Sequence, residues 1–305
     1  MAYRTAIRAA IVVVAAGILG CRPAMVPATA AGTVAIDTAN LVARGEYIVR
    51  NAADCGGCHA ASEKDPDGPL SGGMEFKDWR LGTVRASNLT PDSATGLGTW
   101  SDADIVRALR NGQRKNGRVL APVMPYEWLH GMSDADAFAV AQYLKSQRPV
   151  RNEVHQDPNL VFTVARLFLA PKEPMPVAAP PRGPTAAYGR YLADNVALCA
   201  HCHTPRGGIR DGYDNKRAYA GDASPPEGFP VSPSNITPDS ATGIGRWTEA
   251  DFIRTIRTGV DPAGDTLHPI MPWRTIRRMT DDDLKAMYAY LRTIPAIHNE
   301  VKRKE

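Results

Sequence analysis

The pattern of polar and apolar residues along the chain predicts short helices that occur in pairs. Ser101 and Thr248 each place a hydroxyl directly before acidic residues, and a further acid follows three positions after the hydroxyl. This arrangement is typical of a helix N-terminus. The apolar residues that follow predict helices through 105–110 and 252–257, each ending at a glycine.

Further helices repeat in the same way. Ser133 and Thr280 precede acidic first turns, which predicts a second capped helix near the end of each half. Earlier in each half, Gly45 and Gly189 lie in short helical segments, where a glycine allows close packing against another helix. The expected fold class is therefore all-α, with two small helical units in tandem.

The N-terminus carries a different pattern. Two arginines precede an apolar run over 9–19 that is short for a membrane span, which predicts a secretory signal. Residues 18–21 resemble a bacterial lipoprotein cleavage box, although one residue of the box is bulkier than usual, so we expect lipidation of Cys21. The alternatives are cleavage near 28–31, with loss of Cys21, and an uncleaved anchor.

Composition and charge narrow the function classes. The 305 residues suggest about two domains, and an apolar content of 44% is ordinary for a globular protein. The formal net charge of +4 is small for this length, and we find no nucleic-acid-binding motif. We therefore expect no nucleic-acid partner.

Four of the five cysteines belong to a five-residue motif that occurs twice, as CGGCH at Cys55–His59 and as CAHCH at Cys199–His203. Two thiols three positions apart can bond one porphyrin, and the histidine after the second thiol can bind the iron, so each pentad predicts a c-type haem site. The predicted covalent attachment residues are Cys55, Cys58, Cys199 and Cys202, with His59 and His203 as axial ligands. A disulfide framework, a zinc site and a redox dithiol are the alternatives, and the repeated histidines disfavour them.

The two halves share more than the pentads. Gly45, Tyr47 and Asn51 recur 144 positions later, whereas the loop at 87–98 recurs at 234–245, which is 147 positions later. The second half therefore carries three extra residues between pentad and loop. Proline, glycine and aspartate in this density predict a structured loop, held by turn hydrogen bonds of Asn88 and of its counterpart Asn235.

A haem that shuttles electrons without binding a substrate needs a second axial ligand. Met124 and Met271, each followed by proline, lie 147 positions apart, and we predict that their soft thioethers bind the two irons. Met132 and Met279 repeat at the same offset but fit the core better. His268, three residues before Met271, is the rival ligand.

Aromatic residues also repeat. Tyr47, Tyr191, Trp100 and Trp247 are expected to pack against haem or to donate hydrogen bonds to its propionates, with plain core packing as the alternative.

Six prolines between 171 and 184 predict a stiff, extended linker. The apolar segment 160–169 before it keeps no single period, so it fits a helix or a strand packed on a haem edge or at the domain boundary. The expected organisation is a signal and flexible N-terminus (1–31), a first cytochrome domain (41–154), the linker (155–184) and a second cytochrome domain (185–301).

The pentads, the Asn-Leu/Ile-Thr-Pro-Asp-Ser-Ala-Thr-Gly loops and the Met-Pro loops, over about 41–301, resemble a diheme class I cytochrome c. The same loops resemble the cytochrome subunits of bacterial periplasmic dehydrogenases, such as those of alcohol and gluconate dehydrogenases. It implies two covalently bound haem c groups and transfer of electrons from a dehydrogenase's own cofactor to ubiquinone or a terminal oxidase. The chain departs from that pattern in having two pentads where those subunits have three, and a charged C-terminal tail in place of an apolar span. Membrane anchoring and quinone contact then depend on a lipid at Cys21.

We therefore predict an exported, periplasmic electron carrier, not an enzyme, that takes electrons from a dehydrogenase and passes them to an oxidase, a quinone-linked complex or another cytochrome. The alternative is a catalytic diheme enzyme of the peroxidase or thiosulfate-oxidising type. Such an enzyme should lack the methionine in one half, and this chain carries it in both.

Overall fold

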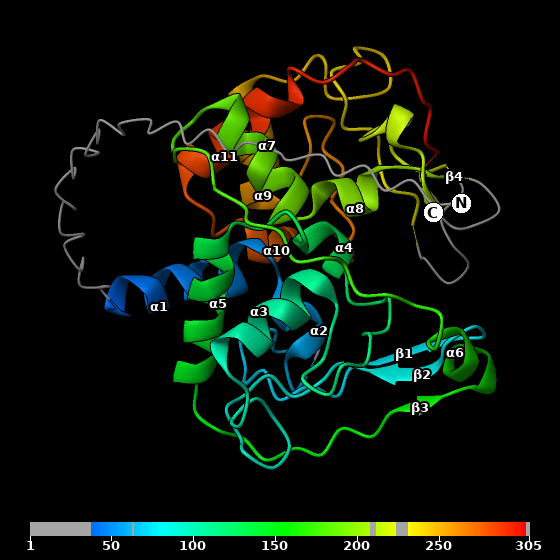
Figure 1. The fold of residues 1–305 in the computed structure, drawn as a ribbon. Coiled ribbons are helices and arrows are strands. Elements are labelled where there is room, and N and C mark those ends of the chain that lie inside the picture. The colour runs from blue at the N-terminus through cyan, green and yellow to red at the C-terminus, as the bar shows by residue number, and fades with distance from the viewer. Residues whose placement is uncertain (1–37, 63, 208–211, 224–230, 303–305) are drawn as a thin grey trace, which may run out of the picture. The chain divides into compact units, whose positions relative to one another are not determined.

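Each half of the chain is built on two helices that cross at a glycine (Figure 1). The structure is a computed structural model that describes residues 38–62, 64–207, 212–223 and 231–302. Cys21 and the predicted signal lie outside the described residues. The helices of the first half are α1 (Thr38–Tyr47), η1 (Ile48–Ala52), α2 (Cys55–His59), α3 (Asp102–Asn111), α4 (Tyr126–Leu129), α5 (Asp134–Ser146) and α6 (Leu160–Ala165). Those of the second half are α7 (Ala186–Asn195), α8 (Cys199–His203), η2 (Asn215–Arg217), α9 (Glu249–Thr258), α10 (Trp273–Ile276) and α11 (Asp281–Leu291).

The predicted close packing at Gly45 and Gly189 is confirmed. Helix α1 packs on α5, and α7 packs on α11. A Cβ atom on Gly45 would lie 2.0 Å from the carbonyl oxygen of Ala139, and one on Gly189 would lie 1.8 Å from that of Ala286. Only a hydrogen atom fits at these crossings.

The predicted helix caps are also confirmed. Ser101 and Thr248 accept hydrogen bonds from the backbone N–H groups of Asp104 and Asp251, whose side chains bond back to the cap residues. Helices α3 and α9 end at left-handed glycines, Gly112 with φ 69° and Gly259 with φ 74°.

The prediction of an all-α fold needs one correction, because the structure contains two small antiparallel sheets. One has the order β1 (Glu75–Asp78), β2 (Gly82–Arg85), β3 (Asp157–Pro158), and the other pairs β4 (Arg206–Gly207) with β5 (Gly212–Tyr213). Phe76 lies opposite Val84 in the first hairpin. Strands of two to four residues carry too little alternation to be recognised in the sequence.

The apolar segment at 160–169 is a short helix followed by a turn, which settles the open choice between helix and strand, and most of its side chains are exposed. Phe162 is its one buried residue, since only one side of α6 faces the protein.

The proline-rich segment 171–184 contains neither helix nor strand and follows the surface of the first half. Val177 accepts a hydrogen bond from the N–H of Asp134 (2.9 Å), and Met175 accepts one from Arg110 (2.7 Å). The segment is therefore attached to the first half and is not a free spacer. None of the helices in the described part of the chain is both long and apolar enough to span a bilayer.

Candidate haem sites

Both pentads form one-turn helices, α2 and α8, that begin after a sharp bend. The bend residues Asp54 and Leu198 adopt left-handed φ angles of 50° and 57°, which few non-glycine residues do. None of the four pentad cysteines is part of a disulfide bond. Burial raises the pKa of Cys55 and of Cys199 to about 12 each, so these thiols are protonated at neutral pH.

The pentad histidines are held in the same way in both halves. Nδ1 of His59 lies 2.8 Å from the carbonyl oxygen of Ser87, and Nδ1 of His203 lies 2.7 Å from that of Ser234. A carbonyl can only accept, so Nδ1 donates the proton and Nε2 keeps its lone pair for a metal. Burial lowers the pKa of both imidazoles, and the hydrogen bonds to the carbonyls offset only part of this lowering. The lowered pKa favours the neutral imidazole, which is the form that binds a metal.

A buried hydrogen-bond network holds the Ser87 carbonyl in place. The Asn88 amide donates to Thr95 Oγ1 (3.1 Å) and to the Val150 carbonyl (2.8 Å). Its oxygen accepts from the N–H (2.9 Å) and hydroxyl (2.7 Å) of Thr90. The loop is therefore fixed both within itself and to the segment that follows α5.

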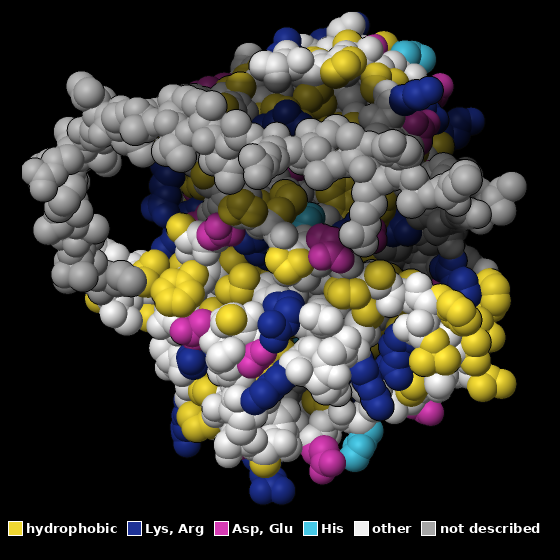
Figure 2. Space-filling view, in the orientation of Figure 1, with side chains coloured by type: hydrophobic (Ala, Val, Ile, Leu, Met, Phe, Trp, Pro, Cys, Tyr) yellow, Lys and Arg dark blue, Asp and Glu magenta, His cyan; other side chains and the backbone are white. Residues whose placement is uncertain are grey.

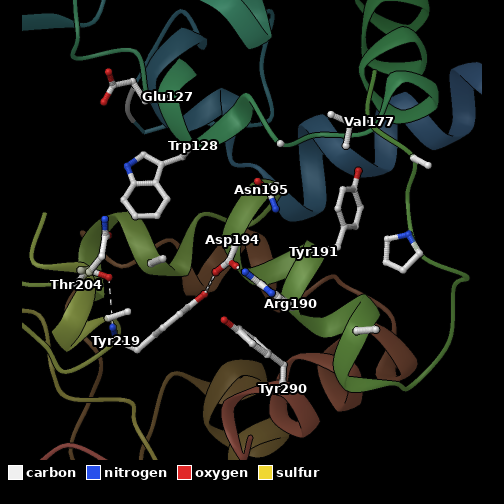
Figure 3. Close-up of a pocket in the computed structure, with 17 residues that line it drawn as sticks. Glu127, Trp128, Val177, Arg190, Tyr191, Asp194, Asn195, Thr204, Tyr219 and Tyr290 are labelled. Atoms are coloured by element: carbon white, nitrogen blue, oxygen red, sulfur yellow. Dashed lines mark hydrogen bonds and ion pairs between the residues drawn. The ribbon is translucent and has the colours of Figure 1, made fainter. Parts of the chain in front are cut away.

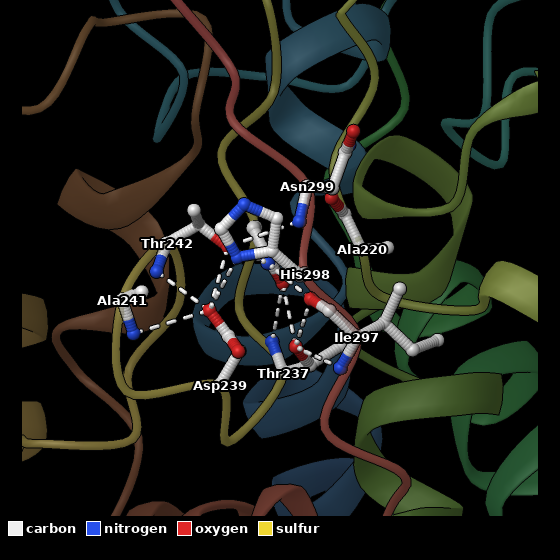
Figure 4. Close-up of polar contacts among 9 residues, drawn as sticks. Ala220, Thr237, Asp239, Ala241, Thr242, Ile297, His298 and Asn299 are labelled. Carbon is white, nitrogen blue, oxygen red and sulfur yellow. Dashed lines mark hydrogen bonds and ion pairs between the residues drawn. The ribbon is translucent and has the colours of Figure 1, made fainter.

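The second half repeats this network (Figure 4). Asn235 donates to Thr242 Oγ1 (2.9 Å) and to the Ile297 carbonyl (2.8 Å), and Thr237 closes the turn. Asp239 accepts from Thr242 and lies 3.6 Å from His298. The predicted turn bonds of Asn88 and Asn235 are confirmed, and the repeated loop sequence now has a physical reason: it places the carbonyl that orients the pentad histidine.

The two Met-Pro loops adopt the same turn. The N–H groups of Met124 and Met271 donate to Ala121 and His268 (both 3.0 Å), and helices α4 and α10 begin directly after the prolines. Both methionines are partly buried and pack against the core. The rival ligand His268 is exposed, and its Nδ1 accepts from the N–H of Ile270 (3.2 Å).

Met132 and Met279 are each 1% exposed, which confirms them as core residues.

The residues near these positions fit a haem. Among the described residues, two buried side-chain polar atoms have no hydrogen-bond partner, the hydroxyl of Thr255 and Nε1 of Trp273. Trp273 follows Met271 by two positions, and an unmatched N–H donor there suits a carboxylate such as a haem propionate. In the same part of the chain, no three His, Cys, Asp or Glu side chains meet as they would around a zinc ion.

The hydroxyls of Tyr47 and Tyr191 connect the two halves, so their predicted bonds to propionates are wrong. Tyr47 donates to Asp283 (2.5 Å), and Tyr191 donates to Asp136 (2.7 Å). Each hydroxyl also accepts the N–H of the residue that caps α11 or α5, Thr280 (2.9 Å) or Ser133 (3.1 Å). Helix α1 thus reaches the N-terminus of α11, and α7 reaches the N-terminus of α5, so the two contacts are related by an approximate two-fold axis.

Sequence reasoning missed these bonds, although a signal was present. The two tyrosines lie 144 positions apart in the sequence, and the cap residues and acids of α5 and α11 lie 147 positions apart.

The two halves differ at a pair of equivalent positions in this contact, where the first half has Gly131 and the second has Arg278. Arg278 forms an ion pair with Asp67 (2.7 Å), closing one side of the contact between the halves. On the other side, beside Gly131, lies a cavity of about 600 Å³ (Figure 3). Its lining includes Trp128, Tyr191 and Asp194, together with Ala200 of the second pentad, so the cavity borders helix α8 but is not lined by the predicted haem ligands.

The chain is similar in sequence to known cytochromes c. The family model described as cytochrome c matches residues 42–148 and 186–295. The cytochrome c subunit of a quinone alcohol dehydrogenase from Gluconobacter oxydans is 32% identical over 84% of this chain and 55% of its own length. The gluconate 2-dehydrogenase cytochrome c subunit of Pantoea cypripedii is 32% identical over 86% of this chain and 62% of its length. A diheme cytochrome c-type protein of Cereibacter sphaeroides is 29% identical over 83% of this chain and 86% of its length. The chain thus spans little more than half the length of the two dehydrogenase subunits.

Proposed function

Because the chain belongs to the cytochrome c family, we propose that it is a periplasmic diheme electron carrier with His59/Met124 and His203/Met271 as its axial ligand pairs. The observation that carries this proposal is the duplicated contact of a pentad histidine with a backbone carbonyl, Ser87 in one half and Ser234 in the other. In both halves Nδ1 of the pentad histidine bonds a carbonyl, which leaves Nε2 for the iron. Both halves also carry a Met-Pro loop, and the two loops form the same type of turn.

The residues have distinct roles in this proposal. Haem c supplies the one-electron chemistry when bound. The four pentad thiols would hold it covalently, and the carbonyls of Ser87 and Ser234 fix the imidazole tautomer and ring plane. Methionine ligation and burial both favour positive reduction potentials, because a soft thioether stabilises ferrous iron.

The partners follow from the relatives. Two are named as cytochrome subunits of an alcohol and a gluconate dehydrogenase, which supports a dehydrogenase as the electron donor of this chain. The acceptor would be an oxidase, a quinone-linked complex or another cytochrome. Export, with Cys21 lipidated, belongs to the same proposal and agrees with haem attachment outside the cytoplasm.

Replacing the predicted ligands one at a time tests the proposal. In the purified holoprotein, Met124→Leu and Met271→Leu should each remove about half of the near-infrared band of methionine-ligated ferric haem and lower one of the two reduction potentials. Met132→Leu changes a buried methionine outside the ligand set, and His268→Gln changes the rival ligand; both should leave the band intact.

The wild-type protein also separates a carrier from the catalytic alternative. A carrier with both irons six-coordinate should bind carbon monoxide weakly at both haems. Tight binding at one haem, together with only half of the expected methionine band, would contradict the proposal and favour a peroxidase or thiosulfate-oxidising enzyme.

A further inference from the structure

A group of large apolar side chains lies exposed on the first half, at the turn between β1 and β2, on α6 and in the turn that follows α6. We call it the apolar surface; its residues are Trp79, Leu160, Val161, Val164, Leu167 and Phe168. Trp79, Leu167 and Phe168 are 76%, 80% and 83% exposed. Hydrogen bonds join its two parts, because Asn159 donates to the carbonyls of Trp79 (2.5 Å) and Leu81 (3.2 Å).

The surface can be followed in the figures. Figure 1 shows α6 beside the β1–β2 hairpin. In the same orientation, Figure 2 shows hydrophobic side chains gathered at that edge, with Lys or Arg side chains next to them. Single exposed apolar residues are common on soluble proteins, but a contiguous group of this kind marks an interaction site.

The apolar surface is held in place by ordered structure. Asn159 caps α6 by accepting the N–H of Phe162 (2.8 Å), and the Phe162 ring is buried against the body of the protein. The guanidinium of Arg166 lies 5.6 Å from the centre of that ring. With Phe162 directed inward, the other apolar side chains of α6 are directed outward.

Arginines outnumber acids beside the surface, where Asp157 of β3 is an exposed carboxylate. Arg114, Arg118 and Arg166 lie close enough together that burial and the two neighbouring guanidiniums lower the pKa of Arg114. Within the described ranges, no ion pair joins a carboxylate to any of the three. The nearest acid of the hairpin turn, Asp78, is already paired with Arg80 (3.2 Å). An anionic layer would therefore be attracted here.

We propose that the apolar surface lies on an anionic phospholipid membrane, with Trp79, Leu167 and Phe168 at the boundary between headgroups and acyl chains. Aromatic and aliphatic side chains beside arginines are the composition of elements that lie in the membrane interface without spanning it. Arginine stems cover apolar area while their guanidiniums reach lipid phosphates. This contact goes beyond the proposed electron transfer and does not depend on it.

Hydrogen exchange of the full-length holoprotein tests the contact. We expect vesicles of phosphatidylcholine with phosphatidylglycerol to slow exchange at 79–82 and 160–169, and vesicles of phosphatidylcholine alone to do so much less. Leu167→Ser combined with Phe168→Ser should weaken vesicle binding by at least about tenfold. Arg118→Gln or Arg166→Gln should each weaken it about fivefold on anionic vesicles.

A matched pair of variants separates the apolar surface from general hydrophobicity. Val164→Ser lies on the surface and Val260→Ser lies in the second half, and the two valines are 48% and 37% exposed. Only Val164→Ser should weaken binding. The readout is local, so retention of the chain through a lipid on Cys21 would not protect 160–169.

Two outcomes would overturn the proposal. Vesicle binding with unchanged exchange at 160–169 would place the membrane contact elsewhere. Failure to bind vesicles, with exchange at 160–169 slowing as protein concentration rises, would assign the surface to a second copy of the chain.

Discussion

Asp136 is a buried carboxylate that side chains reach from both halves of the molecule. Arg44 donates two hydrogen bonds to its two oxygens (2.8 and 2.7 Å), and Tyr191 donates a third (2.7 Å). Burial alone would raise the pKa of Asp136, but the bonds and charge of Arg44 outweigh it and hold that pKa below its ordinary value. The counterpart Asp283 is bonded by Tyr47, and among the described residues it has no arginine partner like Arg44, because Tyr188 occupies the position equivalent to Arg44.

Removing the negative charge of Asp136 should destabilise the protein by an amount that depends on pH. A carboxylate whose pKa is depressed by folding stabilises the fold fully above its ordinary pKa of 3.8 and loses that contribution as pH falls through the folded pKa. Asp136→Asn should therefore lower the free energy of unfolding by about 3–5 kcal/mol at pH 7, and the difference from wild type should shrink below about pH 4. Denaturant unfolding at a series of pH values measures both.

Asp282→Asn is the matched control, since Asp282 is 67% exposed on its side chain and 4.0 Å from its nearest partner, Lys285. It should change stability by less than about 0.5 kcal/mol at either pH. A difference between Asp136→Asn and wild type that stays constant down to pH 2 would contradict the assignment of a depressed pKa to Asp136.

At the scale of elements, the contact of α1 with α5 and that of α7 with α11 each depend on a glycine that has no side chain. Gly45 and Gly189 let α1 and α7 approach the backbones of α5 and α11 so closely that a methyl group would overlap a carbonyl oxygen. The helices must move apart to accept it, and the buried residues between them then lose contact.

Gly45→Ala or Gly189→Ala should therefore destabilise the protein, although alanine favours helix over glycine. Overpacking of a core typically costs about 1–3 kcal/mol, and here the obstacle is backbone, so we expect at least the upper end. Thermal unfolding of the holoprotein measures the loss. Gly212→Ala is the control, because the nearest heavy atom to its new Cβ would be 3.9 Å away and its stability should hardly change. An unchanged melting temperature in Gly45→Ala would contradict the packing argument.

The elements also show what the sequence could and could not predict. Caps such as Ser101 with Asp104 and stops such as Gly112 involve residues a few positions apart, so the sequence contains all the information needed to predict them. Strand β3 forms only because 157–158 returns to β2, more than 70 positions earlier, and two residues carry no pattern that would predict such pairing.

The candidate haem sites also combine features that the sequence predicts with features that it could not predict. The pentads and Met-Pro loops follow from spacing and repetition, whereas the carbonyls of Ser87 and Ser234 could not be predicted as partners of the histidines, because every residue has a carbonyl. For Tyr47 and Tyr191, the sequence predicted a buried aromatic residue, but the acid that binds each hydroxyl comes from the other half of the chain.

At the scale of the whole molecule, these two tyrosines couple the halves through reciprocal bonds, Tyr47 to Asp283 and Tyr191 to Asp136. Both acids are buried and lie in the first turns of α11 and α5. Loss of either hydroxyl would leave a cap N–H without that partner; Asp283 would also lose the bond from Tyr47, whereas Asp136 would keep its two bonds from Arg44. Hydrogen bonds to charged groups contribute about 1.5–3 kcal/mol each, so this pair is a large part of what joins the halves.

We therefore expect Tyr47→Phe combined with Tyr191→Phe to uncouple the two halves. Calorimetry of the wild-type holoprotein should show one unfolding transition, and the double variant should show two, because the coupling between the halves is weakened when these bonds are gone and depends on the apolar packing that they share. Tyr288→Phe is the control: its hydroxyl donates to the Trp247 carbonyl (2.7 Å) inside the second half, so this variant should lower the stability of that half without uncoupling it from the first. If the double variant still unfolds in a single transition, shifted no more than the control, then apolar packing between the halves outweighs the tyrosine bonds and the predicted uncoupling is wrong.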